Sequence, residues 1–514
     1  ISGVINIITK KGEEKPTLTI TPSFGSFSFN NQRITFSGKD NKFSYAITGE
    51  HLNTSGWRDR TGFNSKGLGI NLSFNPKEDL MINLNLSGLS EYYEMPGGLT
   101  KTQMETNPRQ AQNQNDDAEY DFFNVNLGIE KNINPNNKFQ VNFAYGRKDG
   151  VSNMENWSSF NSTLLETFSI TPKYILTNPF FGRENKLILG IDFYNQPLNI
   201  KQYGERERTN LINEANIKKI STGFYLHNDF YITNNFIFTF GGRYENAKIS
   251  AKDTSNPLQS KNFKGIAYNS TFTYFIPEKT KIFLKYDKVY RYPFTDEIAY
   301  YYGWVPLVFF NQDLKPEKGN SFEIGTEVYS LKDLKLGLFV FYNILKDEIF
   351  YNLNTWMNEN IGKTKRFGIE FKGDWEITEF INLHWVYTYI DAKLDYEPYI
   401  NKKIPLVPPH KGVIGLTFNL PFDISLTTDF ILTDDMYLGG DYDNNQQPLS
   451  GYATVDVLLR YKPKKFEKNN LNFYFGIENL FNRIYANYGF EGWSENSYYP
   501  ASGRMYKGGV SFSF

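Results

Sequence analysis

The 514-residue chain contains no cysteine and no run of apolar residues long enough to form a membrane-spanning helix. Without cysteine, neither a disulfide framework nor a cysteine-based zinc site can stabilise the fold. A transmembrane helix needs about 20 largely apolar residues in succession, so a helical membrane protein is excluded. The 55 lysine and arginine residues nearly cancel the 56 aspartate and glutamate residues. This balance gives no indication of nucleic-acid binding, which relies on an excess of positive charge.

Aromatic residues are abundant, since 45 Phe, 36 Tyr and 7 Trp make up 17% of the chain, yet the mean hydropathy is only −0.50. Disordered chains are poor in aromatic residues, so this composition indicates a folded protein. A fold assignment must therefore explain why a chain with a low mean hydropathy contains so many large aromatic side chains.

Apolar and polar residues alternate along the whole chain, and this period of two predicts β-strands. Residues 80–87 (LMINLNLS), 123–130 (FNVNLGIE) and 471–478 (LNFYFGIE) each place apolar residues on one face and mostly polar or small residues on the other. No segment keeps the period of an amphipathic helix over four turns. The sequence therefore predicts an all-β protein.

Short polar turns and longer connections also alternate along the chain. Ten short turns separate eleven hairpins, so the pattern predicts 22 antiparallel strands of about 10 residues each. The short turns fall near residues 39–42, 75–79, 132–137, 177–185, 233–235, 277–279, 331–333, 377–379, 421–422 and 462–470. The longer segments between them include 90–120, 195–216, 289–319, 391–409, 433–449 and 479–503.

This pattern is typical of a 22-stranded transmembrane β-barrel with short periplasmic turns and long extracellular loops. One face of each strand contacts lipid and the other lines the lumen, which accounts for the low mean hydropathy. Closure also removes the strand edges that lipid would leave without hydrogen bonds. The alternative is a soluble β-propeller, a binding module, which predicts a repeat of about 40–50 residues. The chain shows no such repeat.

Several segments are characteristic in their order and spacing. The chain opens with GVINIITKKG (3–12), and YRYPFTDEI (290–298) is followed by NQDLKPEKGNSFEIG (311–325). VPPHKGVIGLTF (407–418) and FGIENLFNRIYANYG (475–489) come later, and the chain ends with YYPASGRMYKGGVSFSF. Together these segments resemble the TonB-dependent outer-membrane receptors, and the likeness extends over nearly the whole chain.

The resemblance implies that residues 1–12 are the last strand of a plug domain and that residues 13–514 are the receptor-type barrel. Because the chain begins within a motif, we expect it to be a fragment that lacks its natural N-terminus. The resemblance also implies a monomer in the outer membrane of a Gram-negative bacterium, among outer-membrane lipid and lipopolysaccharide. The energy-transducing TonB complex would act on the plug.

The last strand carries a further expectation. Alternate residues at the C-terminus are apolar, aromatic or glycine, up to the final residue. A soluble domain seldom ends this way, because chain ends tend to fray. This terminal strand resembles the family's signal for barrel assembly, which the barrel-assembly machinery recognises. The residues that would carry it are Tyr506, Val510, Phe512 and Phe514.

The sequence does not predict an enzyme or a cofactor. The four histidines form no HExxH motif, and no GxSxG nucleophile elbow is present. We expect His227 and His384 to face the lumen as hydrogen-bonded residues, beside Asp229 and Thr388 respectively. Haem receptors of the family carry a histidine between the two signature segments, and residues 292–313 contain none.

Two aromatic-rich loops are the best candidates for ligand contacts. Tyrosine and tryptophan give rigid apolar contact with a polar tip, which suits the face of a bulky metal chelate. Packing within the loops or an aromatic girdle is the alternative interpretation. The candidates are Arg291, Tyr292, Tyr301, Tyr302, Trp304, Tyr485, Tyr488 and Trp493.

An acidic loop, residues 433–449, contains four aspartates and no lysine or arginine. Clustered carboxylates could hold Ca²⁺, although a solvated acidic loop is the alternative. The long loops carry net negative charge, which favours a neutral or cationic chelate over an anionic ferric catecholate. Acidic loops could instead bridge divalent cations to lipopolysaccharide. The four residues are Asp434, Asp435, Asp441 and Asp443.

These observations lead to one functional expectation and two alternatives. We expect the barrel of an active receptor that imports a scarce metal chelate with energy from TonB. A ferric siderophore is the favoured ligand, and cobalamin is the second candidate. A passive outer-membrane pore or adhesion barrel is the first alternative, and the soluble propeller is the second.

Overall fold

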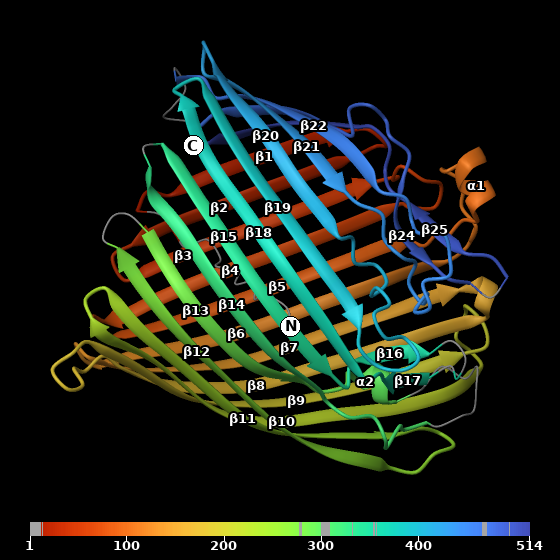
Figure 1. Cartoon of the computed structure of the whole chain (residues 1–514), viewed down its shortest axis with the longest axis horizontal. Coiled ribbons are helices and arrows are strands. Elements are labelled where there is room, and N and C mark those ends of the chain that lie inside the picture. Colours follow the sequence, from red (N-terminus) through yellow and green to blue (C-terminus); the bar gives the residue numbers. More distant parts are fainter. Residues whose placement is uncertain are drawn as a thin grey trace.

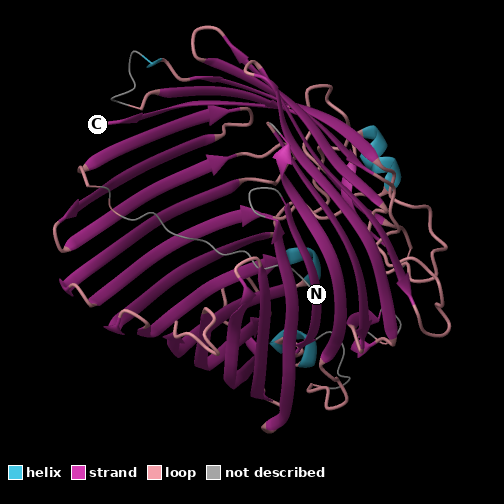
Figure 2. Ribbon diagram, turned by 60° about the vertical axis from the view of Figure 1, so that its left-hand side comes forward, coloured by secondary structure: helices cyan, strands magenta, loops and turns pink. Residues whose placement is uncertain are grey.

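The computed structural model describes residues 12, 14–276, 280–299, 309–331, 333–352, 355, 357–464, 470–492 and 494–514. In it, 22 strands form one antiparallel sheet that closes through the pairing of β1 (Thr17–Gly25) with β26 (Met505–Ser513). Figure 2 shows these strands as a tilted wall that curls around an interior. The prediction of a 22-stranded all-β barrel is therefore confirmed. Of the predicted plug strand, residues 1–11 lie outside the described residues.

The other strands of the barrel follow one another as neighbours in the sheet, each antiparallel to the next. They are β2 (Asn30–Asp40), β3 (Phe43–Thr54), β4 (Phe63–Lys77), β5 (Leu80–Glu94), β6 (Asp117–Asn134), β7 (Asn137–Met154), β8 (Ser159–Leu176), β9 (Asn185–Tyr203), β10 (Leu211–Thr233), β11 (Phe236–Lys252), β12 (Gln259–Ile276), β13 (Thr280–Arg291), β14 (Glu317–Leu331), β15 (Leu334–Lys346), β18 (Lys363–Thr378), β19 (Ile381–Leu394), β20 (His410–Leu420), β21 (Ile424–Thr433), β22 (Tyr452–Tyr461) and β23 (Asn472–Glu478).

The long connections carry small elements of their own. These are the helices α1 (Lys101–Thr106) and α2 (Thr295–Ile298), the 3-10 helix η1 (Glu155–Trp157), and the hairpins formed by β16 (Ile349–Asn352) with β17 (Met357–Asn360) and by β24 (Ala486–Phe490) with β25 (Ser497–Pro500). Among the described residues, no helix is long and apolar enough to cross a membrane.

The two ends of the barrel differ as the sequence predicts. Each of the ten predicted short turns lies at the junction of two consecutive strands, with residues 277–279, 332 and 465–469 outside the described residues. Figure 1 shows α1, α2 and both hairpins together at the opposite, loop-bearing end, on the right, and the C-terminus at the short-turn end. The long connections thus meet at one mouth of the barrel.

Some strands are longer than predicted. The prediction of a long loop at residues 195–216 is wrong, because most of this segment belongs to two strands. β9 has 19 residues and β10 has 23, which leaves only residues 204–210 to connect them. These strands continue past the lipid-facing apolar residues, into a zone where the outer face is polar and the inner face is apolar, with Ile200, Ala215 and Ile217 buried. The apolar residues change from the outer to the inner face there, and the backbone ladder with the neighbouring strands continues.

Alternate residues of the strands separate into an apolar outer face and a polar inner face. Large apolar side chains such as Leu68 and Phe224, each 52% exposed, lie on the outer face. Such an exposed apolar band is favourable only against lipid. On the inner face, the predicted lumen histidines each meet a carboxylate. His227 Nε2 lies 3.2 Å from Asp229 Oδ1, and His384 Nε2 lies 2.9 Å from Asp429 Oδ1, so Thr388 is not the partner of His384.

Candidate functional site: the loop-bearing mouth of the barrel

Part of the mouth is filled by an apolar cluster that anchors the connection between β13 and β14. Ile298 of α2 and Phe310 are fully buried, as is Ile249 on β11. Burying a large apolar side chain stabilises a fold by about 1.5–3 kcal/mol, so this cluster holds the connection firmly against the barrel wall. The cluster comprises Ile200, Ala215, Ile217, Ala247, Ile249, Ala251, Phe263, Tyr292, Ile298, Ala299, Phe310, Leu314 and Ile349.

Two predicted ligand residues belong to this packed region. Arg291 donates from Nε to Glu317 Oε2 at 2.8 Å and from Nη1 to Glu297 Oε2 at 2.7 Å. Tyr292 is only 6% exposed, and its hydroxyl donates to the Glu245 carbonyl at 2.9 Å. Both side chains therefore use their polar groups to fix the mouth, and neither offers them to a ligand. Tyr301, Tyr302 and Trp304 lie outside the described residues.

A second part of the mouth is an open pocket of about 650 Å³ between four of the long connections. The β16–β17 hairpin, the connection after β19, the connection after β21 and the segment after β24 each supply part of its wall. Its lining is Phe350, Tyr351, Asn352, Glu359, Asn360, Ile361, Gly362, Tyr396, Tyr399, Gly440, Tyr442, Asp443, Glu491 and Gly492. We call this the mouth pocket.

Aromatic rings form one side of the mouth pocket. The ring of Tyr399 lies 5.5 Å from that of Tyr396 and 6.1 Å from that of Tyr442, and Tyr442 meets Phe350 edge to face at 5.4 Å. Burial raises the pKa of Tyr442 and of Tyr396, and neighbouring tyrosines add to the effect. The hydroxyls therefore stay protonated at neutral pH and can act as neutral hydrogen-bond donors.

Carboxylates form the rest of the polar lining. Glu359 accepts hydrogen bonds from Thr355 Oγ1 at 2.6 Å and from Asn352 Nδ2 at 2.9 Å. Glu491 accepts one from Gln446 Nε2 at 3.1 Å, and burial together with nearby Asp441 raises the pKa of its carboxyl. No lysine or arginine is among the described residues that line the pocket. The lining of the pocket is thus negatively charged, so it favours positively charged or neutral groups over anions.

The four predicted calcium ligands are not brought together as a metal site. Asp441 is 1% exposed and accepts the backbone N–H groups of Asn445 at 2.8 Å and Gln446 at 3.1 Å, so it shapes its own loop. Asp443 instead lines the mouth pocket. A hydrogen bond with Asp434 raises the pKa of Asp435. Among the described residues, no three acidic or histidine side chains are arranged to hold a metal ion.

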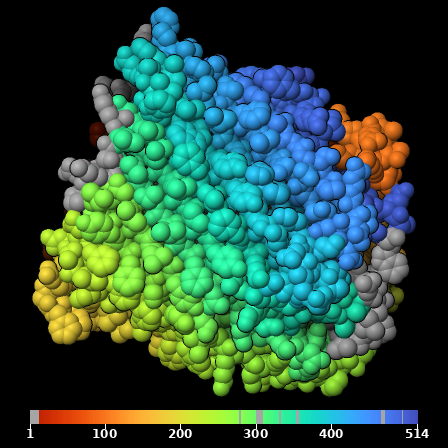
Figure 3. Space-filling view, viewed as in Figure 1, coloured from red at the N-terminus to blue at the C-terminus, as the bar shows by residue number. Residues whose placement is uncertain are grey.

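One of the remaining predicted aromatics lines another pocket, of about 410 Å³, beside α1. Tyr485 lines it and stacks on Tyr452 at 3.9 Å, while Tyr488 meets Tyr499 edge to face at 5.3 Å. Leu99 and Tyr498 exchange backbone hydrogen bonds that tie α1 to β25. Figure 3 shows this orange segment beside the blue C-terminal part of the chain at one edge of the molecule. Trp493 lies outside the described residues.

Apart from Asp443, sequence reasoning did not select the residues that line the mouth pocket. Tyr396, Tyr399, Tyr442 and Glu491 come from three connections far apart in the chain. A tyrosine pair in the segment 391–409 and a tyrosine within the aspartate loop were the available signals. Only the fold shows that these loops meet.

The closed sheet, its lipid-facing outer band and its loop-lined mouth define a transmembrane β-barrel protein with an open pocket at one end. Residues 20–480 match the family described as TonB dependent receptor-like, beta-barrel, and the chain belongs to this family. Its members are transport receptors, so the prediction that the chain is not an enzyme is confirmed. The fold is characteristic of Gram-negative outer-membrane proteins, and the family implies partnership with TonB and ligand binding.

Individual relatives are distant. The chain is 26% identical over 316 residues to an uncharacterized TonB-dependent receptor of Haemophilus influenzae, which covers 57% of this chain and 84% of that one. The ferric-catecholate import receptor Fiu of E. coli K12 superposes with a TM-score of 0.83 at 16% identity, covering 100% of this chain and 84% of Fiu. The ferric yersiniabactin uptake receptor FyuA of Yersinia pestis superposes with a TM-score of 0.83 at 16% identity. This match covers 100% of this chain and 82% of FyuA.

Proposed function

We propose that this barrel is part of an active importer that captures a ferric siderophore at the mouth pocket and moves it inward with energy from TonB. The observation that carries the proposal is the pocket itself, which combines tyrosine rings and carboxylates at the loop-bearing end. Family membership supports the use of TonB, and several structural relatives take up ferric chelates.

The chemistry of the pocket narrows the ligand class. Its volume of about 650 Å³ lies within the range of small-molecule sites, roughly 300–1,000 Å³. Tyr396, Tyr399 and Tyr442 offer flat apolar contact and hydroxyl donors to the organic shell of a chelate. Glu359, Asp443 and Glu491 repel anions. We therefore favour a neutral or cationic ferric siderophore, with cobalamin as the second ligand.

The test is uptake by cells that produce the full-length gene product and lack their other receptors of this family. Radiolabelled ferric siderophores of neutral, cationic and anionic types are supplied with and without a protonophore. We expect uptake of a neutral or cationic chelate to stop when the proton gradient collapses. Uptake that continues without the gradient would refute energy coupling.

A conductance measurement separates this proposal from a passive pore. The full-length protein is inserted into a planar bilayer, and the current is recorded at constant voltage. An active receptor is expected to stay closed, whereas a large constant conductance would favour a pore. Labelled cyanocobalamin in the uptake assay separates the two proposed ligand classes.

A further inference from the structure

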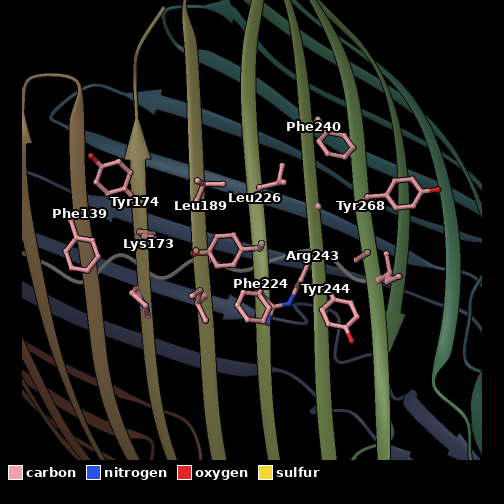
Figure 4. A pocket seen from close by; sticks show the side chains of 17 residues that line it. Phe139, Lys173, Tyr174, Leu189, Phe224, Leu226, Phe240, Arg243, Tyr244 and Tyr268 are labelled. Carbon is pink, nitrogen blue, oxygen red and sulfur yellow. The ribbon is translucent and has the colours of Figure 1, made fainter. Parts of the chain in front are cut away.

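The mouth pocket is built differently from a larger groove in the barrel wall. That groove, of about 930 Å³, is lined by residues of the consecutive strands β7 to β12, and Figure 4 shows their side chains projecting from neighbouring strands. The hydrogen-bond ladder of a sheet fixes the spacing of such strands at about 4.7–4.9 Å. The mouth pocket is instead lined by four separate connections. Its shape therefore depends on the bonds that hold these connections to one another.

Two of these connections carry the tyrosines of the mouth pocket. Tyr396 and Tyr399 belong to the connection after β19, and Tyr442 belongs to the connection after β21. All three side chains pack against a buried apolar cluster that includes Leu394 and Ile404. Apolar burial has no preferred direction. It keeps the three rings near one another, but it does not fix the distance between the two connections.

Asn444 joins the two connections through directional hydrogen bonds. Lys403 N donates to Asn444 Oδ1 at 2.6 Å, and Asn444 Nδ2 donates to the Lys403 carbonyl at 3.1 Å. A further bond runs from Asn444 Nδ2 to the Asp441 carbonyl, also at 3.1 Å. An asparagine amide offers two donor hydrogens and one acceptor oxygen, so both of its polar atoms are used here. We call the pair of bonds with Lys403 the Asn444 clasp.

The clasp adjoins the residues that this connection contributes to the mouth pocket. Tyr442 and Asp443 line the pocket and directly precede Asn444. Their turn is closed by a bond from Asn444 N to the Asp441 carbonyl at 3.3 Å. Asn444 has a φ of 54°, in the left-handed region that glycine and asparagine adopt most readily. Glycine would therefore suit the backbone of this turn, but it would not form the clasp.

A second link between the two connections does not depend on Asn444. Leu406 N donates to the Tyr437 carbonyl at 2.9 Å, and both groups belong to the backbone. Loss of the clasp would thus leave the connections attached at this point and packed on the apolar cluster. The turn that carries Tyr442 would then be free to change its distance from the opposite wall of the pocket.

We propose that Asn444 is a positioning residue for ligand capture. Its clasp holds the Tyr442 ring at a fixed distance from the rings of the other connection before the ligand arrives. The inference rests on the proposed function of the mouth pocket. Without the clasp, the connections sample other arrangements, and only the fraction with the correct spacing binds. Association slows in proportion to that fraction, whereas the contacts of the bound state, and with them the dissociation rate, are retained.

Binding kinetics of the purified full-length protein test this role with two probes, ferrichrome as a neutral ferric chelate and ferrioxamine B as a cationic one. Asn444→Gly keeps the backbone conformation and removes the clasp. It is expected to lower the association rate constant about tenfold, because two hydrogen bonds are lost, and to change the dissociation rate constant by less than about twofold. Tyr442→Ala removes a contact and is expected to act mainly through faster dissociation. Heat-dependent mobility on gels shows that each variant is folded.

A matched control makes the same substitution at the mouth without affecting the clasp. Asn401 lies in the connection after β19, has a φ of 65° and is exposed. Its side chain has no hydrogen bond to the part of the chain that the structure describes. Asn401→Gly therefore gives the same gain in backbone freedom, and it is expected to bind both chelates with wild-type rate constants.

Hydrogen exchange supplies a second readout, which needs no ligand. Asn444→Gly is expected to speed exchange of the Lys403 amide, although Lys403 lies in the other connection. Unchanged exchange, an unchanged association rate in Asn444→Gly, or equal slowing by Asn401→Gly would overturn the inference and leave the proposed function intact. A wild type that binds neither chelate would instead refute the proposed ligand class, and the capture role of Asn444 with it.

Discussion

Phe514, the last residue of the chain, exchanges two backbone hydrogen bonds with Leu18 in the first strand of the barrel. Phe514 N donates to the Leu18 carbonyl at 2.9 Å, and Leu18 N donates to the Phe514 carbonyl at 3.3 Å. The two ends of the barrel domain are thus joined at the seam where the sheet closes. Without closure, both strands would present unpaired backbone groups to lipid.

Deletion of Phe514 is expected to reduce the amount of folded receptor in the outer membrane. It removes one pair of seam hydrogen bonds and the terminal aromatic ring, which lies 5.2 Å from Phe512 and is 66% exposed. The measurement is the heat-modifiable fraction in outer-membrane preparations. Phe481→Ala serves as control, because Phe481 is 74% exposed and lies in the connection after β23, at the opposite end of the barrel from Phe514. Equal folded fractions for deletion and control would contradict the predicted assembly role.

Tyr442→Ala is expected to weaken binding of the ferric siderophore about 30-fold or more, because buried aromatic residues at the centre of a site contribute about 2 kcal/mol or more. Tyr442→Phe retains the ring and is expected to lose much less. Dissociation constants are measured by fluorescence quenching. Tyr274→Ala, on the lipid-facing side of β12, is the control. Tyr442→Ala with wild-type affinity would remove the mouth pocket as the capture site.

The affinity for a cationic chelate is expected to fall on acidification. Glu491 attracts a cation only when ionised, and burial raises the pKa of this carboxyl. The loss therefore begins at a higher pH than for an ordinary glutamate, whose pKa is about 4.3. Titration calorimetry between neutral and acidic pH measures this, and Glu491→Gln is expected to flatten the profile. A neutral chelate of similar size serves as control. An affinity that rises on acidification would show that the site prefers anions.

Arg291→Ala is expected to loosen the mouth without unfolding the barrel. It leaves Glu297 and Glu317 partly buried and unpaired, at a cost of about 1–3 kcal/mol once the partial exposure of the arginine is considered. Hydrogen exchange should increase in α2 and in the β16–β17 hairpin, because Glu317 also accepts from Ile349 N at 2.9 Å. Arg33→Ala, whose pair with Glu50 is exposed, is the control. Unchanged exchange in both elements would contradict this role.

The architecture was accessible from local patterns. Alternation and turn residues are properties of neighbouring residues, so the ten short turns, and with them the strand number, could be placed correctly. The terminal strand could be identified for the same reason. Strand lengths could not, because beyond the lipid zone the alternation of β9 and β10 is inverted, with polar residues on the outer face and Ile200, Ala215 and Ile217 buried on the inner face. Pairing with the adjacent strands maintains these segments, and such pairing has no signature in the segment itself.

Unlike the strand number, most of the candidate site could not be predicted from the sequence. Aromatic loops are visible in the sequence, and Tyr485 and Tyr488 do lie at the mouth. The roles of Arg291 and Tyr292 were not predictable, since their partners Glu245 and Glu317 lie on other strands. The mouth pocket likewise combines Tyr396, Tyr442 and Glu491 from separate connections. Local sequence determined that this chain forms a 22-stranded barrel with aromatic loops. Tertiary structure decided which of those residues meet, because barrel closure alone brings the ends of distant strands together.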